Sequence, residues 1–132
     1  MIADGAHNPE GVRALARSLA GPRMPKPLIG VLAIMRDKGY EEMLASLLPL
    51  LDGVVCTKAG EARSLSADEL GAIVTTSAVA AGRSGLDVAV ESDPHAALAL
   101  ACRCAGAKGS VLIAGSLFLL EDLRDVLAPS IY

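Results

Sequence analysis

The sequence has few aromatic residues and little excess charge, and both shortages restrict what it can bind. Only Phe118, Tyr40 and Tyr132 of its 132 residues are aromatic. Proteins that bind single-stranded nucleic acid stack bases on aromatic side chains, and a basic patch is typical of nucleic acid binding in general. Here 12 Lys and Arg residues are outnumbered by 15 Asp and Glu residues, which gives a formal net charge of −3. We therefore expect no nucleic acid partner.

Long uninterrupted apolar runs are also missing, although 52% of the residues are apolar. A membrane-spanning helix needs about 20 consecutive apolar residues. The most apolar segments, residues 28–35 and 111–120, are as short as a strand or are interrupted by Gly115-Ser116. The first residues do not combine a basic region, an apolar stretch and a cleavage site, so we expect no signal peptide. The sequence predicts a cytoplasmic domain with no membrane partner.

Cysteine spacing excludes a metal or disulfide framework. Cys56, Cys102 and Cys104 are odd in number, and no second closely spaced pair completes a zinc site. We interpret them as reduced thiols that pack as small apolar side chains. We predict no metal site within the chain.

Three common catalytic or nucleotide-binding motifs are absent. The sequence contains no G-x-x-x-x-G-K-[ST] phosphate-binding loop, no G-x-G-x-x-G after the first predicted strand and no G-x-S-x-G nucleophile motif. The chain therefore lacks a complete catalytic apparatus of its own.

The sequence does contain a regular alternation of short apolar runs with segments of helical periodicity. Strands are predicted at residues 1–3, 27–35, 53–56, 87–90 and 110–114. Helices are predicted from Asn8-Pro9 to a stop at Gly21-Pro22, over 40–51, from Ser66 to about Ala80, from Asp93-Pro94 through Cys104, and from Ser116 through Val126. This order predicts an α/β, Rossmann-like, doubly wound fold: a mostly parallel sheet of about five strands with helices on both faces. The length suits a single domain spanning residues 1–132.

In such sheets, ligands bind in the loops that follow the carboxyl ends of the strands. The first of these loops holds Asp4, His7 and Asn8. An Asp at a strand end can accept hydrogen bonds from ribose hydroxyls, and a His can bind a phosphate or carboxylate and titrates near neutrality. Asn8 is also a good residue to cap the helix that begins at Pro9.

Three further candidates follow later strands. Lys38 can bind a phosphoryl or carboxylate oxygen as a point charge, and Arg63 can bind either anion with two hydrogen bonds. Ser116 begins the last predicted helix, where backbone N–H groups can hold an anion. His95 lies in the first turn of a helix, and we expect it to be structural.

The segment Asp4-Gly5-Ala6-His7-Asn8-Pro9, followed by an amphipathic helix, resembles the start of the C-terminal domain of folylpolyglutamate synthase/dihydrofolate synthase enzymes, in the Mur ligase superfamily. Three later segments are similar to motifs of that family in the same order: Asp37-Lys38 after a strand, Thr57 followed by Arg63, and Gly115-Ser116-Leu117-Phe118-Leu119. The resemblance covers essentially the whole chain.

The resemblance implies an ATP-dependent ligase that joins L-glutamate to folate or dihydropteroate, with ATP and Mg²⁺ bound mainly by an N-terminal domain of the same polypeptide. It implies that Asp4, His7 and Asn8 bind the nucleotide and that Ser116 and Arg63 bind glutamate. His7 and Lys38 would act at the reacting groups. The isolated chain would then be inactive.

Two alternatives remain open. Another Mur-type ligase, joining an amino acid to a peptidoglycan precursor, shares the Asp-x-Ala-His pattern, although the motif at residues 115–119 favours the folate branch. A stand-alone nucleotide-binding or signalling module without chemistry would share the fold. An in-frame phosphate-loop domain encoded upstream of Met1 would support the ligase over the module.

Overall fold

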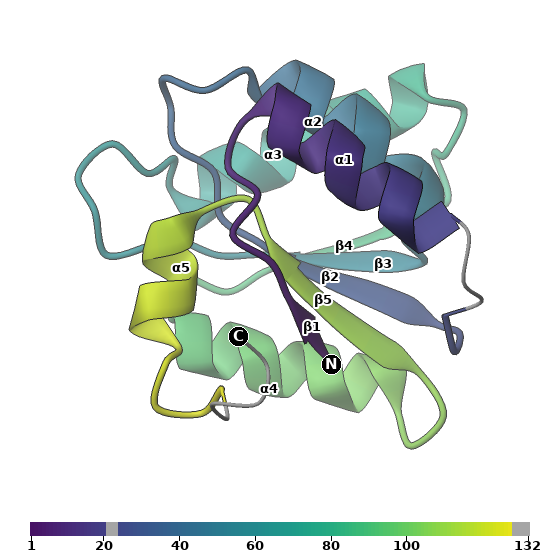
Figure 1. Cartoon of the computed structure of the whole chain (residues 1–132). Coiled ribbons are helices and arrows are strands. Elements are labelled where there is room, and N and C mark those ends of the chain that lie inside the picture. Colours follow the sequence, from purple (N-terminus) through teal and green to yellow (C-terminus); the bar gives the residue numbers. More distant parts are fainter. Residues whose placement is uncertain (21–23, 128–132) are drawn as a thin grey trace.

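The computed structural model describes residues 1–20 and 24–127, which form a parallel sheet between two layers of helices (Figure 1). The strands are β1 (Ile2–Ala3), β2 (Leu28–Leu32), β3 (Gly53–Cys56), β4 (Asp87–Val90) and β5 (Ser110–Ala114). Their order in the sheet is β1-β5-β2-β3-β4, and every neighbouring pair is parallel. The predicted fold class is confirmed.

The α-helices are α1 (Pro9–Ala20), α2 (Tyr40–Leu47), α3 (Ala67–Ala80), α4 (Pro94–Ala105) and α5 (Leu117–Asp122). Figure 1 shows α1, α2 and α3 on one face of the sheet and α4 on the other, with α5 beside the end of β5. The stop predicted at Gly21-Pro22 lies outside the described residues. No helix in the described part of the chain is both long and apolar enough to cross a membrane.

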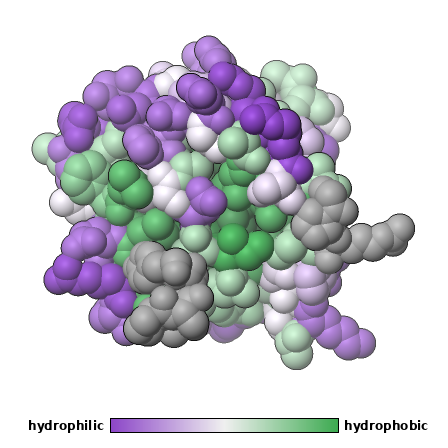
Figure 2. Space-filling view, in the orientation of Figure 1, coloured by the Kyte–Doolittle hydropathy of each residue, from purple (hydrophilic) through white to green (hydrophobic). Residues whose placement is uncertain are grey.

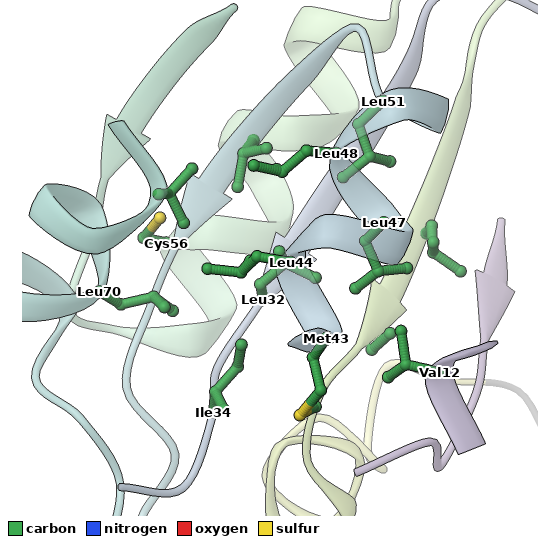
Figure 3. Packing of buried hydrophobic residues seen from close by; sticks show 14 of the residues in the cluster. Val12, Leu32, Ile34, Met43, Leu44, Leu47, Leu48, Leu51, Cys56 and Leu70 are labelled. Atoms are coloured by element: carbon green, nitrogen blue, oxygen red, sulfur yellow. The ribbon is translucent and has the colours of Figure 1, made fainter. Parts of the chain in front are cut away.

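Burial explains why the central strands are continuous apolar runs. Every residue of β2, β3 and β5 is buried, because helices cover both faces of the sheet. The edge strand β4 is partly or largely exposed along its whole length, and β1 is half-buried. The layer under α1, α2 and α3 is packed mainly by leucines of α2 and the sheet, including Leu32, Leu44 and Leu47 (Figure 3). A second apolar cluster lies under α4 and α5.

Two predicted helices end earlier than expected. Helix α2 ends at Leu47 and continues as a 3₁₀ helix over Leu48–Leu50, because Pro49 cannot donate the hydrogen bond that an α-helix needs. Helix α5 ends at Asp122 and does not reach Val126. Asp122, the last residue of the helix, accepts a hydrogen bond from the Gly60 N–H at 2.7 Å, and in the turns that follow Leu127 returns to the core. Helical periodicity in the sequence cannot predict these tertiary contacts.

The prediction for the cysteines is right for one of the three. Cys56 is buried, and burial raises the pKa of its thiol to about 12. Cys102 and Cys104 are free but exposed, because α4 turns Leu98, Ala101 and Ala105 toward the sheet in their place.

Candidate functional site

Four predicted site residues come together in one pocket at the carboxyl ends of the strands. The pocket has a volume of about 170 Å³. His7 follows β1, Lys38 follows β2, Arg63 follows β3 and Ser116 follows β5. Met35, Leu117 and Phe118 complete its walls. Four separate loops therefore contribute one polar side chain each.

The loop after β1 uses its side chains to hold its own shape. The Ala6 N–H donates to Asp4 Oδ1 at 2.8 Å, which forms a tight turn. His7 Nδ1 lies 2.9 Å from the Gly5 carbonyl oxygen. A carbonyl oxygen can only accept, so Nδ1 carries the proton, and Nε2 of the neutral ring is left as an acceptor. Asn8 Oδ1 accepts from the Gly11 N–H at 2.8 Å and so caps α1 as predicted.

Asp4 and Asn8 do not line the pocket. Asp4 lies in a wider hollow of about 670 Å³ beside β1 and α5, which shares Leu117 with the pocket. Asn8 lines neither of these two spaces. The first loop therefore presents its Asp and its His to adjoining but different spaces.

The loops after β2 and β3 pair with each other, and this pairing places Lys38 and Arg63. Met35 forms an antiparallel bridge with Ser64, and the Arg36 N–H donates to the Arg63 carbonyl at 2.7 Å. The Lys38 side chain is half-buried, and within residues 1–20 and 24–127 no group pairs with its ammonium. Lys38 is therefore the pocket's uncompensated cation.

Arg63 is held by two carboxylates and a ring. Its Nε donates to Glu61 Oε1 at 3.0 Å, and its Nη1 donates to Asp37 Oδ2 at 3.2 Å. Its Cζ lies 5.9 Å from the centroid of the Phe118 ring. Hydrogen bonds from Arg63 lower the pKa of Glu61, and the hydrogen bond to Glu61 raises the pKa of Arg63. Both groups therefore stay charged.

Ser116 owes its position to the glycine before it. Gly115 has φ +102°, which an L side chain rarely adopts, and its N–H donates to the Ala6 carbonyl at 3.0 Å. Ser116 is 1% exposed, and its Oγ accepts from the Phe118 N–H at 3.0 Å. Its own hydroxyl proton can still be donated.

Two residues noted in the sequence have structural partners. Thr57 is fully buried, and its hydroxyl donates to the Ser92 carbonyl at 3.2 Å. His95 Nε2 lies 2.8 Å from Asp125 Oδ1, which raises the pKa of His95. Neither residue lines the pocket, in agreement with the structural role expected for His95.

The side chains at this end of the sheet suit an anion better than a metal ion. Across the described residues, no group of three or more His, Cys, Asp or Glu side chains could hold a metal. The residues present do not fit Mg²⁺. Lys38, with the hydrogen-bonding groups of Arg63 and Ser116, fits phosphate or carboxylate oxygens.

Our interpretation of the sequence missed the residues that build the walls and hold Arg63. Leu117 and Phe118 line the pocket, and their place directly after Ser116 could have indicated this. Glu61 contacts Arg63 from two residues away in the same loop, whereas Asp37 reaches Arg63 only through the pairing of two loops. No sequence pattern would have found that contact.

Comparison with known proteins agrees with the fold and identifies the family. Residues 1–117 match the family described as Mur ligase, glutamate ligase domain. The dihydrofolate synthase/folylpolyglutamate synthase of Mycobacterium tuberculosis is 43% identical over 67 residues, which are 51% of this chain and 14% of that protein. A probable bifunctional folylpolyglutamate synthase/dihydropteroate synthase of Halobacterium salinarum is 36% identical over 124 residues, 94% of this chain and 14% of that protein.

Solved structures are similar over nearly the whole chain. Folylpolyglutamate synthase of M. tuberculosis, complexed with ADP, has a TM-score of 0.80 and 27% identity over 93% of this chain. The Thermotoga maritima folylpolyglutamate synthase has a TM-score of 0.74 and 27% identity over 96% of it. The chain spans 28% and 27% of those two proteins. With 117 of its 132 residues matched by the family's model, this chain belongs to the Mur ligase family, as a glutamate ligase domain.

Proposed function

We propose that residues 1–132 are the C-terminal domain of an ATP-dependent folate:L-glutamate ligase, a folylpolyglutamate synthase that can also act as a dihydrofolate synthase. The domain contributes to nucleotide and glutamate binding when it closes on the rest of the polypeptide. The observation that carries this proposal is the pocket that collects His7, Lys38, Arg63 and Ser116 from four loops. The M. tuberculosis and T. maritima relatives named above support the choice of substrates.

Several polar side chains near the pocket make hydrogen bonds that stabilise the fold and still have donor or acceptor atoms free to bind a ligand. Among the described residues, Asp4 Oδ2, His7 Nε2 and the Lys38 ammonium have no partner. Asp4 would accept hydrogen bonds from the nucleotide ribose, and the amide of Asn8 would add a donor. Lys38 would neutralise charge on the phosphoryl group being transferred.

The proposed reaction has two steps. The carboxylate of folate or dihydropteroate attacks the γ-phosphorus of ATP, which forms an acyl phosphate and releases ADP. The amine of L-glutamate, having lost a proton, then attacks the acyl carbon, forms the amide bond and expels phosphate. His7 Nε2 is suited to hold a proton where nucleotide and glutamate meet, and Ser116 and Arg63 would orient the glutamate carboxylates. Mg²⁺ and most of the phosphate contacts belong to the N-terminal domain.

An apolar surface beside the pocket favours packing against another domain. Leu117 and Phe118, which line the pocket, are 53% and 41% exposed. The face drawn in Figure 2 is hydrophilic over the helices at the top and apolar at its centre. Packing another domain there would bury apolar area and exclude water, which would otherwise hydrolyse an acyl phosphate. The free thiols of the three cysteines fit a reducing compartment, and we place the enzyme in the cytoplasm.

The proposal is tested by substituting Lys38 and His7 in the full-length protein that contains this domain. We expect Lys38→Ala to lower kcat/KM for glutamate-dependent ADP formation by about a hundredfold, because an uncompensated cation is lost where charge develops. His7→Ala lowers it as well, and both variants still unfold cooperatively on heating. Lys108→Ala is the matched control, because Lys108 is exposed and precedes β5 at the opposite edge of the sheet.

Folate, dihydropteroate and a peptidoglycan precursor are offered as alternative acceptors. Glutamate-dependent turnover with either pteridine supports the proposal. Turnover with the peptidoglycan precursor alone, or parental kinetics in both pocket variants, contradicts it.

A further inference from the structure

Arg63 is more tightly restrained than its exposure suggests. Its side chain is 50% exposed, yet it is contacted from three directions. Glu61 binds Nε, Asp37 binds Nη1, and the ring of Phe118 lies near the guanidinium carbon. Glu61 lies in the same loop as Arg63, Asp37 lies in the loop after β2, and Phe118 lies in α5, so no single element fixes the guanidinium.

The three contacts leave one edge of the guanidinium available. Among residues 1–20 and 24–127, nothing is hydrogen-bonded to Nη2. Arg63 lines the pocket that also holds His7, Lys38 and Ser116, whereas Asp37 and Glu61 do not line it. The carboxylates therefore hold the guanidinium from outside the pocket.

We propose that Asp37 and Glu61 are positioning residues that orient Arg63 so that its Nη2 binds a carboxylate of the acidic amino acid in the pocket. This inference rests on the proposed function and deepens it. A free arginine loses much conformational freedom when it binds a ligand, and two fixed hydrogen bonds remove that cost before binding. Phe118 limits movement of the guanidinium on a third side and favours the cation over its ring.

A second arginine at the same end of the sheet provides a matched comparison. Arg36 donates to both carboxylate oxygens of Glu69 at 2.7 and 2.9 Å. This ion pair also joins the loop after β2 to the segment after β3, and it is exposed to a similar degree. It does not line the pocket. Removing this ion pair therefore measures how much a loosened contact between these segments affects KM when no pocket residue is disturbed.

The test uses Asp37→Asn in the full-length protein, with Glu69→Gln as control. The change to an amide keeps the side-chain volume but loses the charge, so we expect KM for L-glutamate to rise about fivefold, with kcat within about twofold of the parent. Asp37→Glu, which keeps the carboxylate, restores part of the affinity. Glu69→Gln leaves KM unchanged. In an Arg63→Ala background, Asp37→Asn has no further effect, because the residue it positions is gone.

Equal effects of Asp37→Asn and Glu69→Gln, or a full effect of Asp37→Asn in the absence of Arg63, overturn the proposal. A second measurement separates its failure from that of the proposed function. The arginine Nε–Hε signals of the unliganded protein are recorded by NMR, and Arg63→Lys identifies the Arg63 signal. We expect Asp37→Asn to shift it, whether or not the protein ligates glutamate. An unchanged signal refutes positioning even in an active enzyme.

Discussion

Single residues at this site make hydrogen bonds that stabilise the fold, and each still has a polar group that can bind a ligand. Asn8 caps α1 with its oxygen, and His7 fixes its tautomer against the Gly5 carbonyl. Ser116 accepts backbone hydrogen bonds at the start of α5. Each of these side chains has a second polar atom or a proton in reserve. A residue that caps a helix can therefore also be a candidate ligand-binding residue, and the two interpretations do not exclude each other.

His95 supports a prediction about pH. The hydrogen bond to Asp125 raises the pKa of His95 and lowers that of Asp125. Because the folded pKa of His95 is raised, the contact stabilises the fold fully below the ordinary pKa of about 6.5, and this stability is lost as pH rises through the folded pKa. We expect Asp125→Asn to lower the pKa of His95 in an NMR titration.

Glu121→Gln is the control, because that neighbouring carboxylate pairs with Arg124. It should leave the His95 titration unchanged. A pKa of His95 that does not respond to Asp125→Asn would contradict the assignment.

At the level of elements, the turn from β5 into α5 connects the sheet to the pocket. A Cβ added to Gly115 would lie 2.5 Å from the carbonyl oxygen of Ala33, at a φ of +102°. The turn needs glycine for its backbone conformation and for the space beside the Ala33 carbonyl. Ser116 and Phe118 follow it directly, so this one turn places two walls of the pocket.

Gly115→Ala should therefore be more destabilising than a substitution that brings only conformational strain. We expect it to lower the free energy of unfolding by about 3 kcal/mol in urea denaturation, since strain and a steric clash add. Gly82→Ala is the comparison, because Gly82 has φ +74° but nothing within 4 Å of an added Cβ. Its cost should be about 1 kcal/mol. Equal losses would mean that the contact with Ala33 is relieved without cost.

At the level of the whole molecule, the chain has the core of a domain and a pocket lined by side chains from four loops. Two apolar clusters cover both faces of the sheet. The pocket offers one uncompensated cation, and the sequence contains no phosphate-binding loop. Aligning a triphosphate, a carboxylate and an amine requires more binding groups than this chain supplies.

We expect the isolated 132-residue chain to fold but not to ligate glutamate. Cooperative urea unfolding with an m-value of about 1–3 kcal/mol/M would show the folded domain. ADP formation in the presence of folate and L-glutamate should stay at the level of the blank, because domain closure is missing. Turnover that copurifies with the isolated chain would contradict this prediction.

The sequence alone predicted the layers, the order of the strands along the chain and the loops that form the pocket, although the strand predicted over 27–35 covers only Leu28–Leu32. Continuous apolar runs indicated strands covered on both faces, and their alternation with helices predicted the parallel sheet. The contact at the end of α5 required the tertiary structure, because Asp122 accepts a hydrogen bond from Gly60, far away in the sequence. The contact of Arg63 with Asp37, 26 residues away, also required it. Local periodicity records which residues are buried, whereas contacts between loops depend on how the finished sheet brings their ends together.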